Sequence, residues 1–120
     1  MLNELRDKLE EIDENVFYGA AKDNDATKNV WNYIVYGRDR MESNQNKTSF
    51  TFYYDVAIIR EEYIPENLIE EVIAKVEECG LRLADASPEF EYEKKNDDTV
   101  VEILVIHFCK AGKRMIDNGY

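Results

Sequence analysis

Residues 100–109, VVEILVIHFC, constrain the fold more than any other part of the chain. Side chains on a β-strand point alternately to its two faces. Here both alternating sets are apolar: one is Val101, Ile103, Val105 and His107, and the other is Val100, Leu104, Ile106 and Phe108. A strand that is apolar on both sides is typical of the interior of a sheet, so we predict that it is a central strand.

Other segments with the same alternation predict the rest of the sheet. Residues 30–37 and about 48–60 are dense in β-branched and aromatic residues and predict a hairpin, with the polar residues 38–47 as a long, unstructured tip. In the second of these strands the more apolar side comprises Phe50, Phe52, Tyr54, Val56 and Ile58. Residues 81–86 and 89–95 predict two short strands, or one interrupted strand, before the last strand. In residues 89–95, Phe90 and Tyr92 alternate with Glu89, Glu91 and Glu93, which indicates one solvated face.

Two amphipathic helices complete the prediction. Apolar residues at spacings of three and four predict a helix over residues 2–15, with Asn3 as a candidate N-cap. A second helix is expected over residues 65–79, because Pro65 suits its first turn and Gly80 its end. The expected class is α+β: two helices packed on a mainly antiparallel four- to five-stranded sheet in the order α-β-β-α-β-β. Residues 1–120 form one domain, with residues 111–120 as a tail that is either frayed or a docking arm.

The charge balance excludes several classes of function. The chain carries 26 acidic and 15 basic side chains, a formal net charge of -11. Such a surface repels phosphate backbones and anionic lipids, so we expect no direct binding of nucleic acid or of a membrane. The charged N-terminal residues do not resemble a signal peptide, which favours the cytoplasm of the cell that makes the protein.

The residues that usually carry chemistry are few. Cys79 and Cys109 are expected as reduced, buried thiols, and zinc is not indicated because there is no Cys-x-x-Cys pair and only one histidine. His107 is expected to be a packed or edge histidine, although its pairing with Cys79 or Cys109 stays open. Glu102 and the acidic residues of the 89–95 strand offer carboxylates, but nothing singles out a catalytic pair. No nucleotide-binding or hydrolase motif occurs, so we expect a protein that is not an enzyme and needs no cofactor or metal.

Two long polar segments and two groups of charged residues point to contacts with other proteins. Residues 19–29 and 38–47 are long loops for so small a domain, and such loops are often functional. The candidate interface combines a group in the second loop with a group near the C-terminus: Arg38, Asp39, Arg40, Lys47, Lys110, Lys113 and Arg114. Basic patches on a strongly acidic protein favour head-to-side contacts between copies.

Three segments carry a resemblance to a known group of proteins. NVFYGAAKDNDATKNVWNYIVYGRDR, KTSFTFYYDVAIIREEYIPENLIEEVI and VVEILVIHFCKAGK resemble small proteins encoded among the head and tail genes of long-tailed phages and prophages of Gram-positive bacteria. The order of helices and hairpins is similar to that of phage tail terminator proteins, which form a hexameric ring that caps the tail tube and joins it to the head. The resemblance implies a homo-oligomeric ring, tail-tube and head-completion proteins as partners, and a final location in the virion tail. A tail-completion or connector role fits the same segments, and no individual residue is carried over.

Two other classes of function remain open. A small acidic phage protein can act as an inhibitor that imitates DNA, although here Lys and Arg are mixed with the acidic residues along both helices. An enzyme whose site is assembled only in space is the third alternative.

Overall fold

The computed structural model describes residues 1–20, 31–43, 49–84, 87–94 and 98–113. Within these ranges the chain forms two helices, α1 (Leu2–Glu10) and α2 (Glu66–Glu78), and six strands. The strands are β1 (Val16–Tyr18), β2 (Tyr33–Ser43), β3 (Ser49–Glu61), β4 (Arg82–Leu83), β5 (Phe90–Lys94) and β6 (Val100–Lys113).

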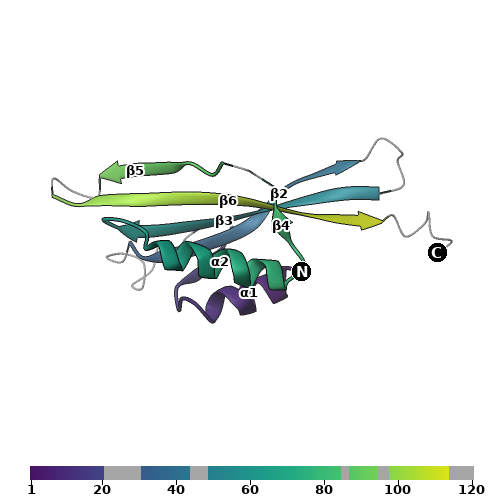
Figure 1. The fold of residues 1–120 in the computed structure, drawn as a ribbon, viewed down its shortest axis with the longest axis horizontal. Helices are drawn as coiled ribbons and strands as arrows, with labels where there is room; N and C mark the ends of the chain where they lie inside the picture. Colours follow the sequence, from purple (N-terminus) through teal and green to yellow (C-terminus); the bar gives the residue numbers. More distant parts are fainter. Residues whose placement is uncertain (21–30, 44–48, 85–86, 95–97, 114–120) are drawn as a thin grey trace.

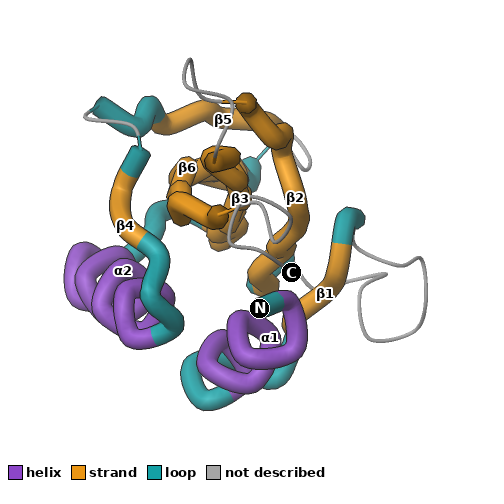
Figure 2. The backbone as a smooth tube through the Cα atoms, turned by 90° about the vertical axis from the view of Figure 1, so that its right-hand side faces the viewer, coloured by secondary structure: helices purple, strands orange, loops and turns teal. Residues whose placement is uncertain are grey.

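The six strands form one sheet in the order β1-β2-β3-β6-β4, and β5 pairs with the same outer edge of β6 as β4 does. All pairs are antiparallel except β1 with β2. Figure 1 shows β2, β3 and β6 running along the length of the molecule. Figure 2 looks along that axis and shows the curled sheet with both helices on one side.

The predicted α+β class is confirmed, and β6 is central, as its two apolar faces predicted. The sheet has six strands instead of four or five, because β1 was not predicted. Its three residues are too few to show an alternating pattern, and it forms by pairing in parallel with β2. The N–H group of Gly19 extends this pairing with a 2.8 Å hydrogen bond to the carbonyl of Tyr36.

The first helix is shorter than predicted. It ends at Glu10, and the chain then turns at Asp13, whose carboxylate accepts a 2.8 Å hydrogen bond from the N–H group of Asn15. The same carboxylate lies 2.6 Å from Nη2 of Arg60 on β3, with both side chains largely buried. These contacts to turn and sheet replace the last helical turn that the periodicity predicted over residues 2–15.

The ends of the helices follow simple backbone rules. Pro65 is the N-cap of α2 and Cys79 its C-cap, so the prediction of residues 65–79 is correct to one residue at each end. Gly80 follows with a φ of +88°, a left-handed conformation that favours glycine. The N-cap of α1 is Met1, so the prediction of Asn3 at this position is wrong.

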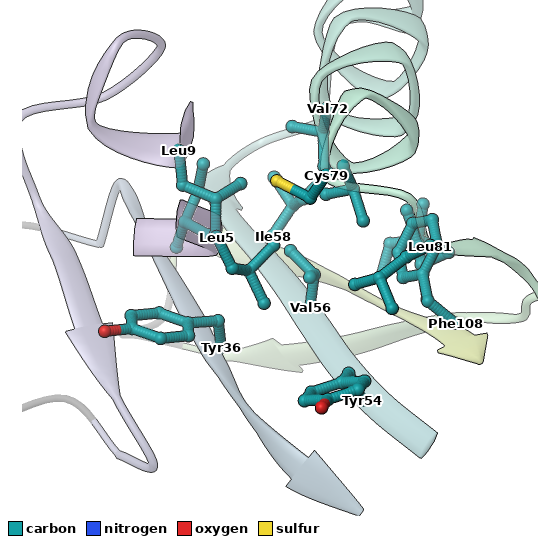
Figure 3. Packing of buried hydrophobic residues seen from close by; sticks show 14 of the residues in the cluster. Leu5, Leu9, Tyr36, Tyr54, Val56, Ile58, Val72, Cys79, Leu81 and Phe108 are labelled. Carbon is teal, nitrogen blue, oxygen red and sulfur yellow. The ribbon is translucent and has the colours of Figure 1, made fainter. Parts of the chain in front are cut away.

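The core lies between the helices and one face of the sheet, which we call the helix-side face (Figure 3). Leu5 and Leu9 of α1 and Val72 and Val76 of α2 are fully buried there. The sheet contributes alternate residues of its three long strands: Ile34, Tyr36, Tyr54, Val56, Ile58, Leu104, Ile106 and Phe108. The side of β3 that was predicted to be more apolar therefore faces the helices. The opposite face, which neither helix covers, we call the open face.

Glu102 is the one charged side chain that the fold buries among the described residues. Its Oε1 accepts a 2.7 Å hydrogen bond from the N–H group of Ile64, in the connection that leads into α2. A hydrogen bond to the same carboxylate raises the pKa of Tyr92 on β5. Glu102 thus ties the entry of α2 to the sheet.

Replacing Glu102 by Ala should lower the free energy of unfolding by about 1–3 kcal/mol, because the N–H group of Ile64 loses its acceptor in a buried place. Urea denaturation measures the loss. Glu102→Gln is the matched control, since its amide oxygen can still accept this hydrogen bond, and it should cost less. Equal losses in the two variants would contradict the assigned role.

The edges of the sheet differ from prediction in two places. Phe90 and Tyr92 on β5 are 46% and 61% exposed, so the predicted covered face of that strand is absent. An open hollow of about 450 Å³, lined by Ile69 and Ile73 of α2 and by Phe90, separates helix and strand. At the C-terminus, β6 continues through residue 113, so residues 111–113 are strand and not tail, while 114–120 lie outside the described residues.

Both cysteines are buried and free, as predicted. Burial raises the pKa of the Cys79 thiol. Cys109 lies on the open face of β6, where its sulfur accepts a 3.5 Å hydrogen bond from Nε of Arg82. Neither thiol is paired with His107, whose partner is described below.

Candidate functional site

Three strand ends extend beyond both helices at one end of the molecule (Figure 1). They are residues 38–43 of β2, 49–54 of β3 and 109–113 of β6, and we call them the arm. The arm makes the molecule long: its extents are 58 × 28 × 23 Å, and its radius of gyration of 16.2 Å exceeds the roughly 13.6 Å expected of a compact domain of this length.

The arm corrects the prediction that residues 38–47 are unstructured. Residues 38–43 are polar, yet they continue β2 because β3 offers them a hydrogen-bonding partner as far as the pair Ser43 and Phe50. The backbone ladder, and not side-chain burial, holds this stretch in a strand. Residues 44–48 lie outside the described residues, as do residues 21–29 of the other predicted loop and residue 30 of the predicted strand.

The structure brings the two predicted charged groups together. Arg38, Asp39 and Arg40 lie on β2, and Lys110 and Lys113 lie on β6, with β3 between them. Lys110 is the register partner of Phe52, and Lys113 that of Ser49. Lys47 and Arg114 fall outside the described residues. Patches that are about 70 residues apart in the sequence thus belong to one arm.

A β-bulge shapes the β2 side of the arm. The register shifts between Arg38 and Met41, so Asp39 and Arg40 together stand opposite the single residue Tyr53. The guanidinium of Arg40 lies over the Tyr53 ring, 3.8 Å from its centroid, and its Nη1 is 3.0 Å from Oδ2 of Asp39. A cation stacked on an aromatic ring is held in place and still faces solvent, which suits a charged contact surface.

The helix-side face of the arm combines apolar side chains with Arg38 and Lys110 and has no helix above it. Met41 is 57% exposed, and Phe50 and Phe52 are half-buried with their ring centroids 6.1 Å apart. Exposed apolar groups that lie beside charged residues are typical of protein interfaces.

Both edges of the arm are open within the described part of the chain. β1 pairs with β2 only as far as Tyr36, and β4 pairs with β6 only at Phe108 and Cys109. Beyond these points no described strand borders β2 from Arg38 to Glu42, or the outer edge of β6 from Lys110 onward. Unpaired strand edges are templates for pairing with another chain.

Charge is distributed unevenly between the arm and the rest of the chain. By sequence, the arm holds four basic and two acidic residues, a net charge of +2. Since the whole chain has a net charge of -11, the residues outside the arm sum to -13. The arm and the rest of the chain therefore carry net charges of opposite sign, and opposite charges steer and orient association.

At the root of the arm, on the open face, lies a group that the sequence did not predict. Asp55 of β3 and His107 of β6 are register partners, and Oδ1 of Asp55 lies 2.5 Å from Nδ1 of His107. Asp39 joins them: one ligand atom from each of the three residues lies within 4.8 Å of the others. The sequence did show an acid and a histidine within apolar strands, but only the register places them side by side.

The other candidate carboxylates are not brought into one site. Glu102 is the register partner of Tyr92 and lies on the helix-side face, whereas Glu91 and Glu93 alternate to the opposite side of β5. Glu89 precedes the strand and is exposed. Burial raises the pKa of Tyr33, which lies on the open face, and the negative charge of Glu93 raises that pKa further.

A scan against models of known protein families finds no match to this chain, and a search of curated proteins finds none either. Among the described residues, no helix combines the length and the apolar character needed to cross a membrane.

Proposed function

We propose that this chain is a structural subunit of a phage tail or neck, which assembles with copies of itself into a ring of the tail-terminator type. The observation that carries the proposal is the arm, a projecting basic and aromatic strand layer on an acidic body. The resemblance of the sequence to small proteins encoded among the head and tail genes of long-tailed phages supplies the biological setting.

The arm has the properties needed for contacts between copies. It offers unpaired backbone groups along the described edges of β2 and β6, apolar side chains at Met41 and Phe52, and a fixed cation at Arg40. Strand pairing would give such a contact its strength, and charge would give it orientation. A contact between the arm of one copy and the body of the next joins two different surfaces, which is the kind of contact that closes into rings.

The alternative of a DNA mimic requires a continuous acidic stripe. On the two helices, however, acidic residues alternate with lysines that pair with them: Nζ of Lys8 lies 3.0 Å from Oε1 of Glu78, and Nζ of Lys75 lies 2.9 Å from Oε1 of Glu11. The hydrogen bond to Lys75 also holds the pKa of Glu11 below its usual value. These pairs favour the assembly role.

The mass of the protein in solution tests the proposal. Size exclusion coupled to light scattering, over a series of protein concentrations, should show a species heavier than the 14.1 kDa monomer, with about 85 kDa for six copies. Because the contact joins opposite charges, raising the salt concentration should shift the population toward monomer. A monomeric mass at every concentration and at low salt would overturn the proposal.

A further inference from the structure

The group of Asp39, Asp55 and His107 has the composition of a metal site. It combines one imidazole nitrogen with two carboxylate oxygens, and these atoms lie within 4.8 Å of one another. Nitrogen and carboxylate donors bind zinc at about 2.0–2.2 Å, so three ligands around one ion stand about 3–4 Å apart. The 2.5 Å contact between Nδ1 of His107 and Oδ1 of Asp55 would open to this spacing to admit an ion.

Two separate features of the sheet place these ligands. Asp55 and His107 are directly opposed on neighbouring strands, a geometry that brings side chains close. The bulge lets Arg40 occupy the place over Tyr53, and Asp39 lies toward the other two ligands. The ligands thus all come from paired strands of one sheet, which holds them more firmly than loops would.

The space beside Asp55 is open. The residue of β2 opposite Asp55 is Gly37, which has no side chain to fill the space above the pair. A hollow of about 330 Å³ is lined by Gly37 and Asp55 together with Ala57 and Val105. His107 and Asp55 are 38% and 33% exposed, so the ligands can be reached from solvent.

The charges suit a divalent transition-metal ion. Two carboxylates and a neutral imidazole carry a charge of -2 around the site, and the imidazole favours zinc-like ions over calcium or magnesium, which prefer oxygen ligands. The guanidinium of Arg40 contacts Oδ2 of Asp39 and leaves the other oxygen of that carboxylate available. A neighbour that holds a ligand in this way orients it for the metal.

We propose that Asp39, Asp55 and His107 bind one zinc-class divalent ion on the open face, at the root of the arm. The inference departs from the expectation of no metal, which considered cysteine and histidine spacing but not carboxylates brought in by strand pairing. It is independent of the proposed assembly role, because the ligands all come from one chain.

Titration of the full-length, chelator-treated protein with zinc chloride tests the proposal. Calorimetry should give one zinc ion per chain, and the imidazole signals of His107, the only histidine, should shift in NMR spectra with the same stoichiometry. The variants His107→Ala and Asp55→Asn should each weaken binding by at least about 10-fold. Magnesium chloride should not produce the NMR shift.

Two controls separate this site from other zinc-binding groups. Cys109→Ser removes the thiol that lies two residues from His107 on the same strand face, and Glu91→Gln removes an exposed carboxylate elsewhere. Both variants should bind zinc as the parent protein does, and thermal melting should show that every variant is folded. No binding at sub-millimolar zinc, or binding that survives His107→Ala and Asp55→Asn, would overturn the proposal.

Discussion

The double variant Arg38→Glu and Arg40→Glu should lose self-association while it keeps its fold. Arg38 and Arg40 are exposed and contribute two of the four basic residues of the arm, so the variant changes the charge of the arm from +2 to -2. The arm would then repel the acidic body of a neighbouring copy. The substitution at position 40 also removes the guanidinium that lies over the ring of Tyr53 in the parent protein. Light scattering should report the monomer mass, and circular dichroism should be unchanged.

The matched control is Arg6→Glu with Lys94→Glu, which makes the same change in total charge away from the arm. Both residues are exposed, on α1 and β5 respectively. This control should still assemble. If the two double variants assemble equally well, the arm is not the interface; if both fail, net charge and not the arm governs association.

Replacing Phe108 by Ala should lower the free energy of unfolding by about 3–5 kcal/mol. Phe108 is fully buried on the helix-side face of β6 and belongs to the core beneath the helices (Figure 3). The smaller side chain leaves a cavity that the long, paired strands cannot close by moving, because β6 is held by neighbours on both edges. Urea denaturation with a two-state fit measures the change.

Phe90→Ala is the control for the loss of an aromatic side chain. Phe90 is 46% exposed on β5, and its removal should cost less than about 1 kcal/mol. A cost at Phe108 no greater than that at Phe90 would mean that the core is not centred on β6.

The predictions that succeeded are those that depend on local pattern. The two apolar faces of residues 100–109 placed β6 at the centre of the sheet, and Pro65 and Gly80 fixed the ends of α2. These signals lie within the segment that they describe. The first helix was predicted too long because its ending depends on Arg60, 47 residues away from Asp13.

At the candidate site, too, contacts between distant segments were not predicted. The sequence indicated the basic residues Arg38, Arg40 and Lys110, but placed them in a loop and beside a tail. Polar residues such as 38–43 carry no strand pattern, since their strand is stabilised by the backbone of β3. Asp55 and His107 could not be paired from sequence, because a change of one residue in register would turn one of them to the other face.

What the sequence determined by itself is the α+β class, the side of β3 that is buried and the excess of acidic charge, because each of these follows from which residues stand at which spacing. Only the tertiary structure decided that three strand ends project as one arm and that Asp39, Asp55 and His107 meet at its root. The physical reason is that strand register and bulges arise from pairing between distant segments, and a hydrogen-bonded partner can make a strand of residues that have no strand pattern of their own.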